Sequence, residues 1–251
     1  MSHQPQNRPK STGEPGRLIA LGDIHGCLRP LEALLDALRL QPEDTFVILG
    51  DVINRGFESN QVVECLIALQ PQTHLVFILG NHEEEMLAAR TDVNALARWL
   101  AMGGVATLES YGPNAQLSDV PETHWQFLAD ALPWWICDDY LFTHANYDAD
   151  VAMSDQTATA LRWLSLQEQP PKPHCSGKTA VVGHSANLAG NVIDYGFLRC
   201  LDTGCGLGGV LTAMDVRTRQ IWQCAQDSDI VVWGEQPSTD GSSSQDDQHA
   251  R

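Results

Sequence analysis

Five segments of the chain place a carboxylate, an amide or an imidazole at the end of an apolar run. They carry Asp23 and His25, Asp51, Asn81 and His82, His144, and His184, and a glycine directly precedes Asp23, Asp51, Asn81 and His184. Carboxylate and amide oxygens are hard metal ligands, imidazole nitrogens suit metals of intermediate softness, and a carboxylate can bridge two ions. If the five segments meet in space, they supply the donor set for a pair of divalent cations.

Alternating strand and helix patterns position the first three of these segments. Apolar runs over 18–23, 46–51 and 75–81 predict strands, and residues 28–40 and 59–69 carry apolar side chains at helical spacing. This alternation predicts parallel strands, which carry their ligands at the carboxyl ends.

The second half of the chain predicts shorter strands. They cover 140–144, 179–184, 197–202, 210–216 and 220–224, and helices are expected over 83–102, 122–132 and 157–167. We expect an antiparallel or mixed sheet that packs against the first. Residues 17–233 then form one domain, and the polar segments 1–16 and 234–251 are expected to be disordered flanks.

Composition excludes some functions. The chain has 251 residues with 15 Lys and Arg against 32 Asp and Glu, a formal charge of −17, which argues against nucleic-acid binding. An anionic substrate therefore needs a local cationic feature, such as bound metal. The seven cysteines lack a C-x-x-C pair, and no apolar run is long enough to span a membrane. We expect a reduced, cytoplasmic protein with no membrane partner.

Six blocks of sequence resemble the calcineurin-like metallophosphoesterases, and within them the bacterial phosphoprotein phosphatases. The blocks are GDIHG (22–26), GDVINRG (50–56), GNHEEEM (80–86), FTHA (142–145), VVGHS (181–185) and LDTGCGLGGVLTAMD (201–215). This resemblance implies an α/β fold, a four-layer α/β/β/α sandwich of two mixed sheets with the helices outside. It places a dinuclear metal site at the loops along one edge.

The resemblance also implies residue roles. Asp23 and His25 would bind the first metal, Asp51 would bridge, and Asn81, His144 and His184 would complete the second site. A hydroxide bridging two divalent ions would attack phosphorus directly, with His82 as general acid and Arg55 binding phosphate oxygens. Mn²⁺ is the ion expected in an assay, and an Fe/Zn pair is compatible with the same ligands.

Three departures from the family pattern stand out. Asn54 replaces the acidic residue that orients the catalytic histidine; its amide can accept a hydrogen bond from His82 but carries no charge. Ser165 replaces a second phosphate-binding arginine, so that Arg162 either takes over this role or is a solvated helix charge. Asn146 and Ser185 replace a glycine and a threonine, changes expected to alter only the pocket rim.

The resemblance predicts a metal-dependent phosphomonoester hydrolase acting on phosphoproteins or phosphopeptides, at serine, threonine or also tyrosine. One alternative is a symmetrical dinucleoside tetraphosphate hydrolase, a group that also carries a non-acidic residue at the position of Asn54. Release of ADP from diadenosine tetraphosphate distinguishes the two. Another alternative is a non-catalytic phosphate-binding module, suggested by Asn54 and Ser165 together. His74, His124 and His174 match no block and are expected at the surface or in loops.

Overall fold

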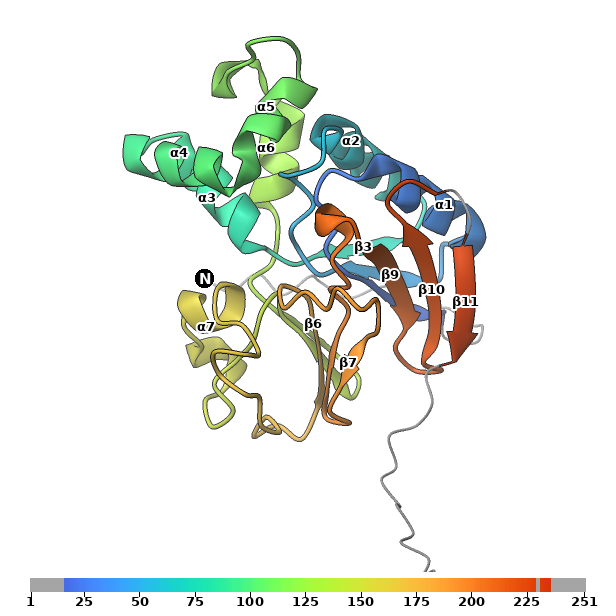
Figure 1. Cartoon of the computed structure of the whole chain (residues 1–251). Helices are drawn as coiled ribbons and strands as arrows, with labels where there is room; N and C mark the ends of the chain where they lie inside the picture. Colours follow the sequence, from blue (N-terminus) through green and yellow to red (C-terminus); the bar gives the residue numbers. More distant parts are fainter. Residues whose placement is uncertain (1–15, 229–230, 236–251) are drawn as a thin grey trace, which may run out of the picture.

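The first sheet contains strands from both ends of the chain. The computed structural model describes residues 16–228 and 231–235, and within them this sheet has six strands in the order β11-β10-β9-β1-β2-β3 (Figure 1). Strands β1 to β3 are parallel, and β9 to β11 are antiparallel to their neighbours. The bounds are β1 Leu18–Leu21, β2 Thr45–Ile48, β3 His74–Phe77, β9 Val210–Asp215, β10 Gln220–Ala225 and β11 Val231–Glu235.

The second sheet is shorter and mixed. Its five strands in the described part of the chain run in the order β4-β5-β6-β8-β7, and β5, β6 and β8 are parallel. Their bounds are β4 Trp135–Cys137, β5 Tyr140–Phe142, β6 Thr179–Val182, β7 Ile193–Asp194 and β8 Leu198–Cys200. The predicted sandwich of two mixed sheets with outer helices is confirmed.

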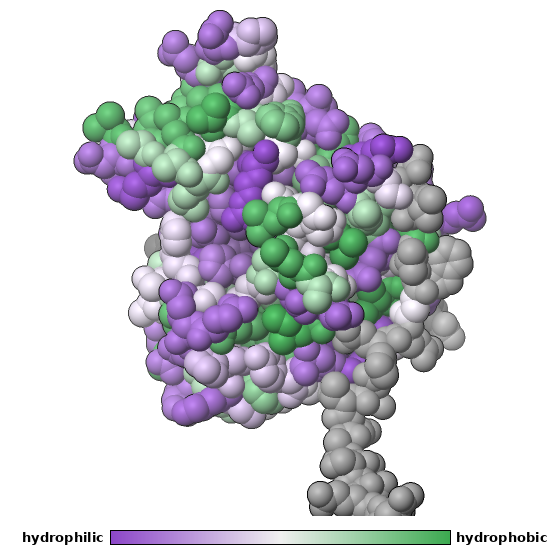
Figure 2. All heavy atoms as spheres, in the orientation of Figure 1, coloured by the Kyte–Doolittle hydropathy of each residue, from purple (hydrophilic) through white to green (hydrophobic). Residues whose placement is uncertain are grey.

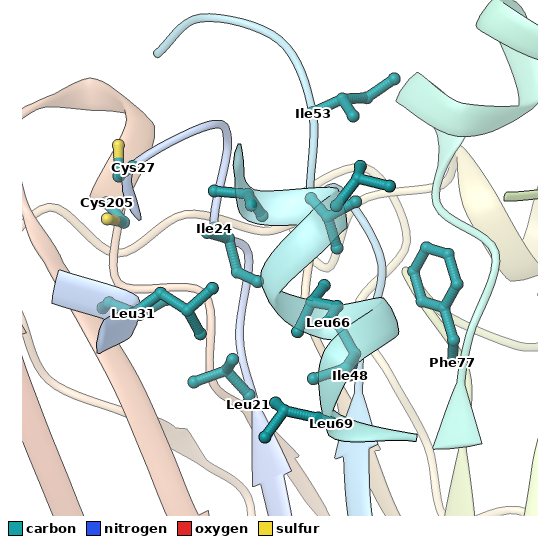
Figure 3. Packing of buried hydrophobic residues seen from close by; sticks show 14 of the residues in the cluster. Leu21, Ile24, Cys27, Leu31, Ile48, Ile53, Leu66, Leu69, Phe77 and Cys205 are labelled. Atoms are coloured by element: carbon teal, nitrogen blue, oxygen red, sulfur yellow. The ribbon is translucent and has the colours of Figure 1, made fainter. Parts of the chain in front are cut away.

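The pleat of the strands separates three apolar cores. In β1, Leu18 and Ala20 face the space between the sheets, whereas Ile19 and Leu21 face the helices α1 (Leu28–Leu38) and α2 (Ser59–Leu69). Figure 3 shows Leu21 and neighbouring side chains packed in this outer layer. In the second sheet, successive side chains of β6 point alternately toward the first sheet and toward the layer that contains α7 (Ala158–Arg162).

Two predictions about the elements need correction. Strands β9 and β10 join the first sheet through β1 rather than the second, and β11, which extends it, includes residues 234 and 235 of the predicted tail. The helix predicted over 83–102 is three helices, because Asp92 caps a new one after α3. These are α3 Asn81–Ala89, α4 Val93–Trp99 and the π-helical turn η1 Leu100–Gly104, followed by α5 Val105–Ser110 and α6 Glu122–Ala129.

The short 3₁₀ turns complete the fold: η2 Leu117–Asp119, η3 Met153–Asp155 and η4 Cys205–Leu207. In Figure 2, hydrophobic residues gather on the face shown, over the connection from β8 to β9 that contains η4. Among the residues described, no helix is both long and apolar enough to cross a membrane. Except for residues 16, 234 and 235, the predicted flanks lie outside the described residues.

Candidate metal centre and phosphate site

The predicted site residues follow the carboxyl ends of β1, β2, β3, β5 and β6. Because these strands are parallel within their sheets, their ends lie along one edge of the sandwich. Nearly all of the candidate ligands are inaccessible to solvent: the exposed fractions of Asp23, His25, Asp51, Asn81 and His144 are 4% or less. Such burial of charged groups is rare unless they are paired or bind a metal.

Asp51 lies at the centre of two ligand clusters. His25, Asp51 and His82 offer atoms within 4.8 Å of one another, and so do Asp51, His144 and His184. The Asp51 Oδ2 atom is 3.7 Å from His25 Nε2, and Oδ1 is 3.4 Å from His144 Nε2. The predicted bridging position of Asp51 is therefore compatible with two cations, one beside His25 and one beside His144 and His184.

Backbone carbonyls orient the rings of the three candidate histidine ligands. His25 Nδ1 lies 3.0 Å from the Ile53 carbonyl oxygen, and His144 Nδ1 lies 2.7 Å from that of Leu49. His184 uses its other nitrogen, since Nε2 lies 3.1 Å from the Trp163 carbonyl oxygen. A ring N–H that donates to a carbonyl leaves a lone pair on the opposite nitrogen. Each of these lone pairs is thus available to a metal.

The surroundings of Asn81 test directly whether the residues present fit a cation. The Asn81 side-chain oxygen lies beside atoms that can each supply an electron pair once His144 Nε2 has lost its proton: His144 Nε2 at 3.0 Å, His184 Nδ1 at 3.3 Å, and the Asp51 oxygens at 3.2 and 3.3 Å. A swapped amide would satisfy these atoms by donating to them. In the orientation present, a divalent cation satisfies all of them at once, because every atom supplies an electron pair. The donor set thus fits a metal.

Backbone strain is concentrated at the same residues. Nine non-glycine residues in the described part of the chain have positive φ, and five are predicted site residues: His25 (49°), Asp51 (51°), Asn54 (72°), Arg55 (68°) and His184 (65°). Left-handed conformations are unfavourable for residues with a side chain and persist where the surrounding structure enforces them. This strain is evidence that this edge of the sandwich is a functional site, and it does not depend on which side chains are metal ligands.

The protonation of the clusters follows from burial and from Asp51. Burial lowers the pKa of His25 to about 3 and that of His184 to about 4, so both rings are neutral ligands. Burial also opposes charge on His144, but the Asp51 carboxylate raises the pKa of this ring to about 10. Despite its burial, the positive charge of His144 and the hydrogen bond from its ring hold the pKa of Asp51 well below its usual range. A cation bound at Asp51 would displace the proton from His144.

Asp23 belongs to neither of the two clusters. Its carboxylate oxygens accept from the backbone N–H of His184 at 3.2 and 3.1 Å, and burial together with the nearby Asp202 carboxylate raises its pKa. Asp202 ends the strand predicted over 197–202 but was not among the predicted ligands. Two buried acids side by side favour a cation between or beside them. The role of Asp23 as a ligand remains a prediction.

The structure reverses the hydrogen bond expected between Asn54 and His82. The Asn54 amide nitrogen, not its oxygen, faces His82 Nδ1, at 2.6 Å. The Asn54 oxygen instead accepts from the Thr107 hydroxyl at 2.8 Å. The expectation that the amide accepts from His82 is therefore wrong, because a residue 53 positions along the chain already occupies the oxygen. His82 then carries its proton on Nε2.

Arg55 and Arg162 have different surroundings. Arg55 has an exposed side chain, and its Nη2 atom lies 3.5 Å from His82 Nε2. The Arg162 guanidinium is 8% exposed and donates to Glu84 at 2.5 Å, while the Trp163 indole donates to the other Glu84 oxygen. Arg55 is thus free to bind an anion, whereas Arg162 has a protein partner, and its predicted substrate contact gains no support.

Glu83, which the sequence pattern treats as part of a helix N-terminal charge run, holds the loop that carries Asp51. Its fully buried carboxylate accepts from the backbone N–H groups of Asp51 at 2.8 Å, Val52 at 2.9 Å and Gly80 at 3.2 Å. Burial and the Asp51 charge raise its pKa to about 7. Its position three residues after Gly80 is the only signal that indicates this helix-capping geometry.

Several other residues expected at the rim or surface are buried. Asn146 binds the Gln169 carbonyl, and the Ser185 hydroxyl accepts from the Leu166 N–H, so both shape loops inside the protein. His124 contacts Glu64 and Tyr111, and His174 contacts Ser176. Because each ring nitrogen of His124 has a protein partner, this histidine has a structural role.

The part of the chain that contains these site residues is similar to known proteins. Residues 16–234 match the family described as calcineurin-like phosphoesterase. A symmetrical bis(5'-nucleosyl)-tetraphosphatase of Pseudomonas fluorescens (strain SBW25) is 27% identical over 276 residues, covering 85% of this chain and 96% of the relative. An enzyme of the same name from Ectopseudomonas mendocina (strain ymp) is 25% identical and covers 82% of this chain and 97% of its own length.

Solved structures share the fold. A candidate diadenosine tetraphosphatase superposes with a TM-score of 0.64 at 23% identity, covering 84% of this chain and 94% of that structure. A cold-active protein-tyrosine phosphatase of a psychrophilic Shewanella gives 0.59 at 15% identity, covering 87% and 80%. At these identities the likeness concerns the architecture alone.

The prediction of a phosphoprotein substrate is wrong. The relatives that match along nearly their whole length are named for dinucleoside tetraphosphates. Charged residues in or directly after two of the matching blocks make internal contacts: Glu84 binds Arg162, Arg217 binds Asp138, and Arg219 pairs with Asp194. Residues that stabilise the scaffold carry no information about the substrate.

Proposed function

Because this chain belongs to the calcineurin-like phosphoesterase family, we propose that it is a symmetrical dinucleoside tetraphosphate hydrolase, which releases two nucleoside diphosphates. The names of its relatives support this substrate class. Divalent cations bound at Asp51 would supply positive charge for the phosphate oxygens and a nucleophilic water near neutral pH. We further propose Mn²⁺ as the ion that supports activity in an assay.

The observation that carries the proposal is the hydrogen bond from Asn54 to His82 Nδ1. It favours a neutral imidazole with its proton on Nε2, and burial also lowers the pKa of His82. A neutral imidazole donates a hydrogen bond but is a weak acid. A serine alkoxide needs a strong acid to leave, whereas a nucleoside diphosphate is a good leaving group without one. This site therefore suits cleavage of a phosphoanhydride.

Arg55 and His82 together form the anion site. Their facing nitrogens, Arg55 Nη2 and His82 Nε2, lie 3.5 Å apart, so two N–H groups can donate to one phosphate oxygen. A guanidinium is always charged, which offsets part of the strongly negative field of this acidic chain. These two groups hold and orient the polyphosphate beside the metal clusters.

Exposed apolar side chains flank the same edge. Phe57 is 73% exposed and follows Gly56, whose N–H donates to the His25 carbonyl at 2.9 Å. Leu207 is 53% exposed and follows Gly206, which packs against the His25 ring. An apolar surface beside a phosphate site suits a nucleoside, which carries a flat aromatic base next to its phosphates. This supports a nucleotide rather than a peptide.

The test supplies the full-length protein, loaded with Mn²⁺, with diadenosine tetraphosphate and follows the products by anion-exchange chromatography. We expect ADP as the sole nucleotide product. Formation of ATP and AMP would contradict symmetrical cleavage. Metal binding at full stoichiometry without any hydrolysis would instead indicate a phosphate-binding module. Parallel reactions with Zn²⁺ and Fe²⁺ test the choice of ion.

The substitution Asn54→Asp is expected to raise the rate of hydrolysis of an alkyl phosphomonoester about 10–100-fold. This is the size of effect that residues hydrogen-bonded to a side chain of a metal site typically have. A carboxylate accepts from His82 Nδ1–H and favours the imidazolium, which is the stronger acid. The measurement is kcat/KM for an alkyl phosphate and for the dinucleotide. The matched control is Asn114→Asp, since Asn114 also has positive φ, at 60°, but is exposed outside the site. Equal or lower alkyl phosphatase activity would contradict the argument.

A further inference from the structure

Thr107 lies on α5, far in sequence from every predicted site residue, and contacts Asn54 twice. Its hydroxyl donates to Asn54 Oδ1 at 2.8 Å and accepts from the Asn54 backbone N–H at 2.9 Å. Thr107 and Asn54 are both fully buried. A hydroxyl has a single proton, and of its two possible acceptors, Asn54 Oδ1 at 2.8 Å and Ser59 Oγ at 3.2 Å, the amide oxygen is the nearer.

The helix that carries Thr107 is itself held in place. Ser110, one turn later, accepts from the Asn60 backbone N–H at 3.0 Å and donates to the Thr107 carbonyl at 2.6 Å. Asn60 belongs to α2, so these bonds tie α5 to the helix that follows the Asn54 loop. The Thr107 hydroxyl therefore has a defined position relative to the Asn54 amide.

The two ends of an asparagine amide are not equivalent, because one accepts and the other donates. With its oxygen bound by Thr107, Asn54 can present only its nitrogen to His82 Nδ1, at 2.6 Å. We infer that Thr107 is a positioning residue that fixes the direction of the Asn54 amide, and through it which nitrogen of His82 carries the proton that can be donated to phosphate. The part of this inference that concerns phosphate binding rests on the proposed function.

Removing the hydroxyl alone should release the amide. In Thr107→Val the shape is conserved, and the Asn54 backbone N–H keeps a second acceptor, the Ser59 hydroxyl at 3.2 Å. The amide can then rotate, so that its oxygen accepts from His82 Nδ1–H. With its proton on Nδ1, His82 has no N–H at Nε2 to donate to a phosphate oxygen, so we expect kcat/KM for the dinucleotide to fall about tenfold. Thr107→Ser keeps the hydroxyl and should restore the wild-type kcat/KM.

A double-mutant cycle separates positioning from packing. In an Asn54→Asp background there is no amide to orient, because both carboxylate oxygens accept. Thr107→Val should then leave kcat/KM for the dinucleotide unchanged. A loss of equal size in both backgrounds would show that the methyl-for-hydroxyl change acts through packing, and would overturn the inference.

A spectroscopic measurement tests the tautomer without any substrate. Full-length protein carrying ¹⁵N-histidine and loaded with diamagnetic Zn²⁺ is examined by two-bond ¹H–¹⁵N correlation at one pH, with His82 assigned by its absence in His82→Gln. We expect the proton on Nε2 in the wild type and in Thr107→Ser, and on Nδ1 in Thr107→Val.

A wild-type proton on Nδ1, or the same tautomer in all three proteins, would overturn the inference. If the wild type instead fails to release ADP from diadenosine tetraphosphate, the proposed function fails, while the spectrum still decides the role of Thr107. Thermal unfolding of each variant verifies that it is folded before the comparison.

Discussion

Asp51→Asn is expected to abolish binding of both metal ions and to lower kcat at least about 10³-fold, since loss of several kcal/mol of charge stabilisation has this effect. Asp51 contributes to both ligand clusters, and its oxygens lie 3.7 Å from His25 Nε2 and 3.4 Å from His144 Nε2. An amide is neutral and offers one oxygen, so it cannot bridge two cations. Metal content by elemental analysis and kcat for the dinucleotide are the two measurements.

The matched control for this substitution is Asp138→Asn. Asp138 also has a φ of 51°, but its side chain is 56% exposed and pairs with Arg217. The same chemical change in the same backbone conformation should therefore leave metal content and kcat at wild-type values. Two equivalents of metal retained by Asp51→Asn would argue against a shared carboxylate.

Glu83→Ala is expected to destabilise the fold by about 3 kcal/mol or more, because it leaves several buried N–H groups without an acceptor at ~1–3 kcal/mol each. The groups concerned are the N–H of Asp51, Val52 and Gly80. For a chain of this size the unfolding temperature should fall by roughly 6–12 °C. Glu83→Gln keeps one acceptor oxygen and should show a smaller decrease.

The control is Glu122→Ala, which removes a glutamate from the first turn of another helix. Glu122 is 76% exposed and forms a surface ion pair with Arg90. Such pairs contribute little, so its unfolding temperature should stay close to that of the wild type. Equal unfolding temperatures for Glu83→Ala and Glu122→Ala would show that Glu83 is a helix-end charge and not the support of the Asp51 loop.

Taken together, the site separates two tasks. The two ligand clusters around Asp51 consist of residues at strand ends, and backbone carbonyls accept hydrogen bonds from the histidine rings. The hydrogen bonds around His82 depend on Asn54 and Thr107. If the proposed roles hold, the surroundings of His82 can change without any change in the candidate metal ligands.

The sequence by itself determined the parallel strands of the first sheet and, through the family resemblance, the edge that carries the site. Alternating strand and helix patterns are local, and parallel strands place their carboxyl ends together, so Asp51 and Asn81 could be brought to one place from the pattern, while the resemblance added His144 and His184. Strands β4 and β7 were missed because two or three residues carry no measurable periodicity.

Only the tertiary structure decided the contacts between distant segments. The strand that β9 joins, the partner of Arg162, the support of the Asp51 loop by Glu83 and the direction of the Asn54 amide all depend on neighbours far along the chain. A hydrogen bond has a direction that the residue type alone does not specify, because an amide can donate or accept. The ligands could thus be read from the order of residues, whereas the chemistry of His82 depended on which groups surround it in space.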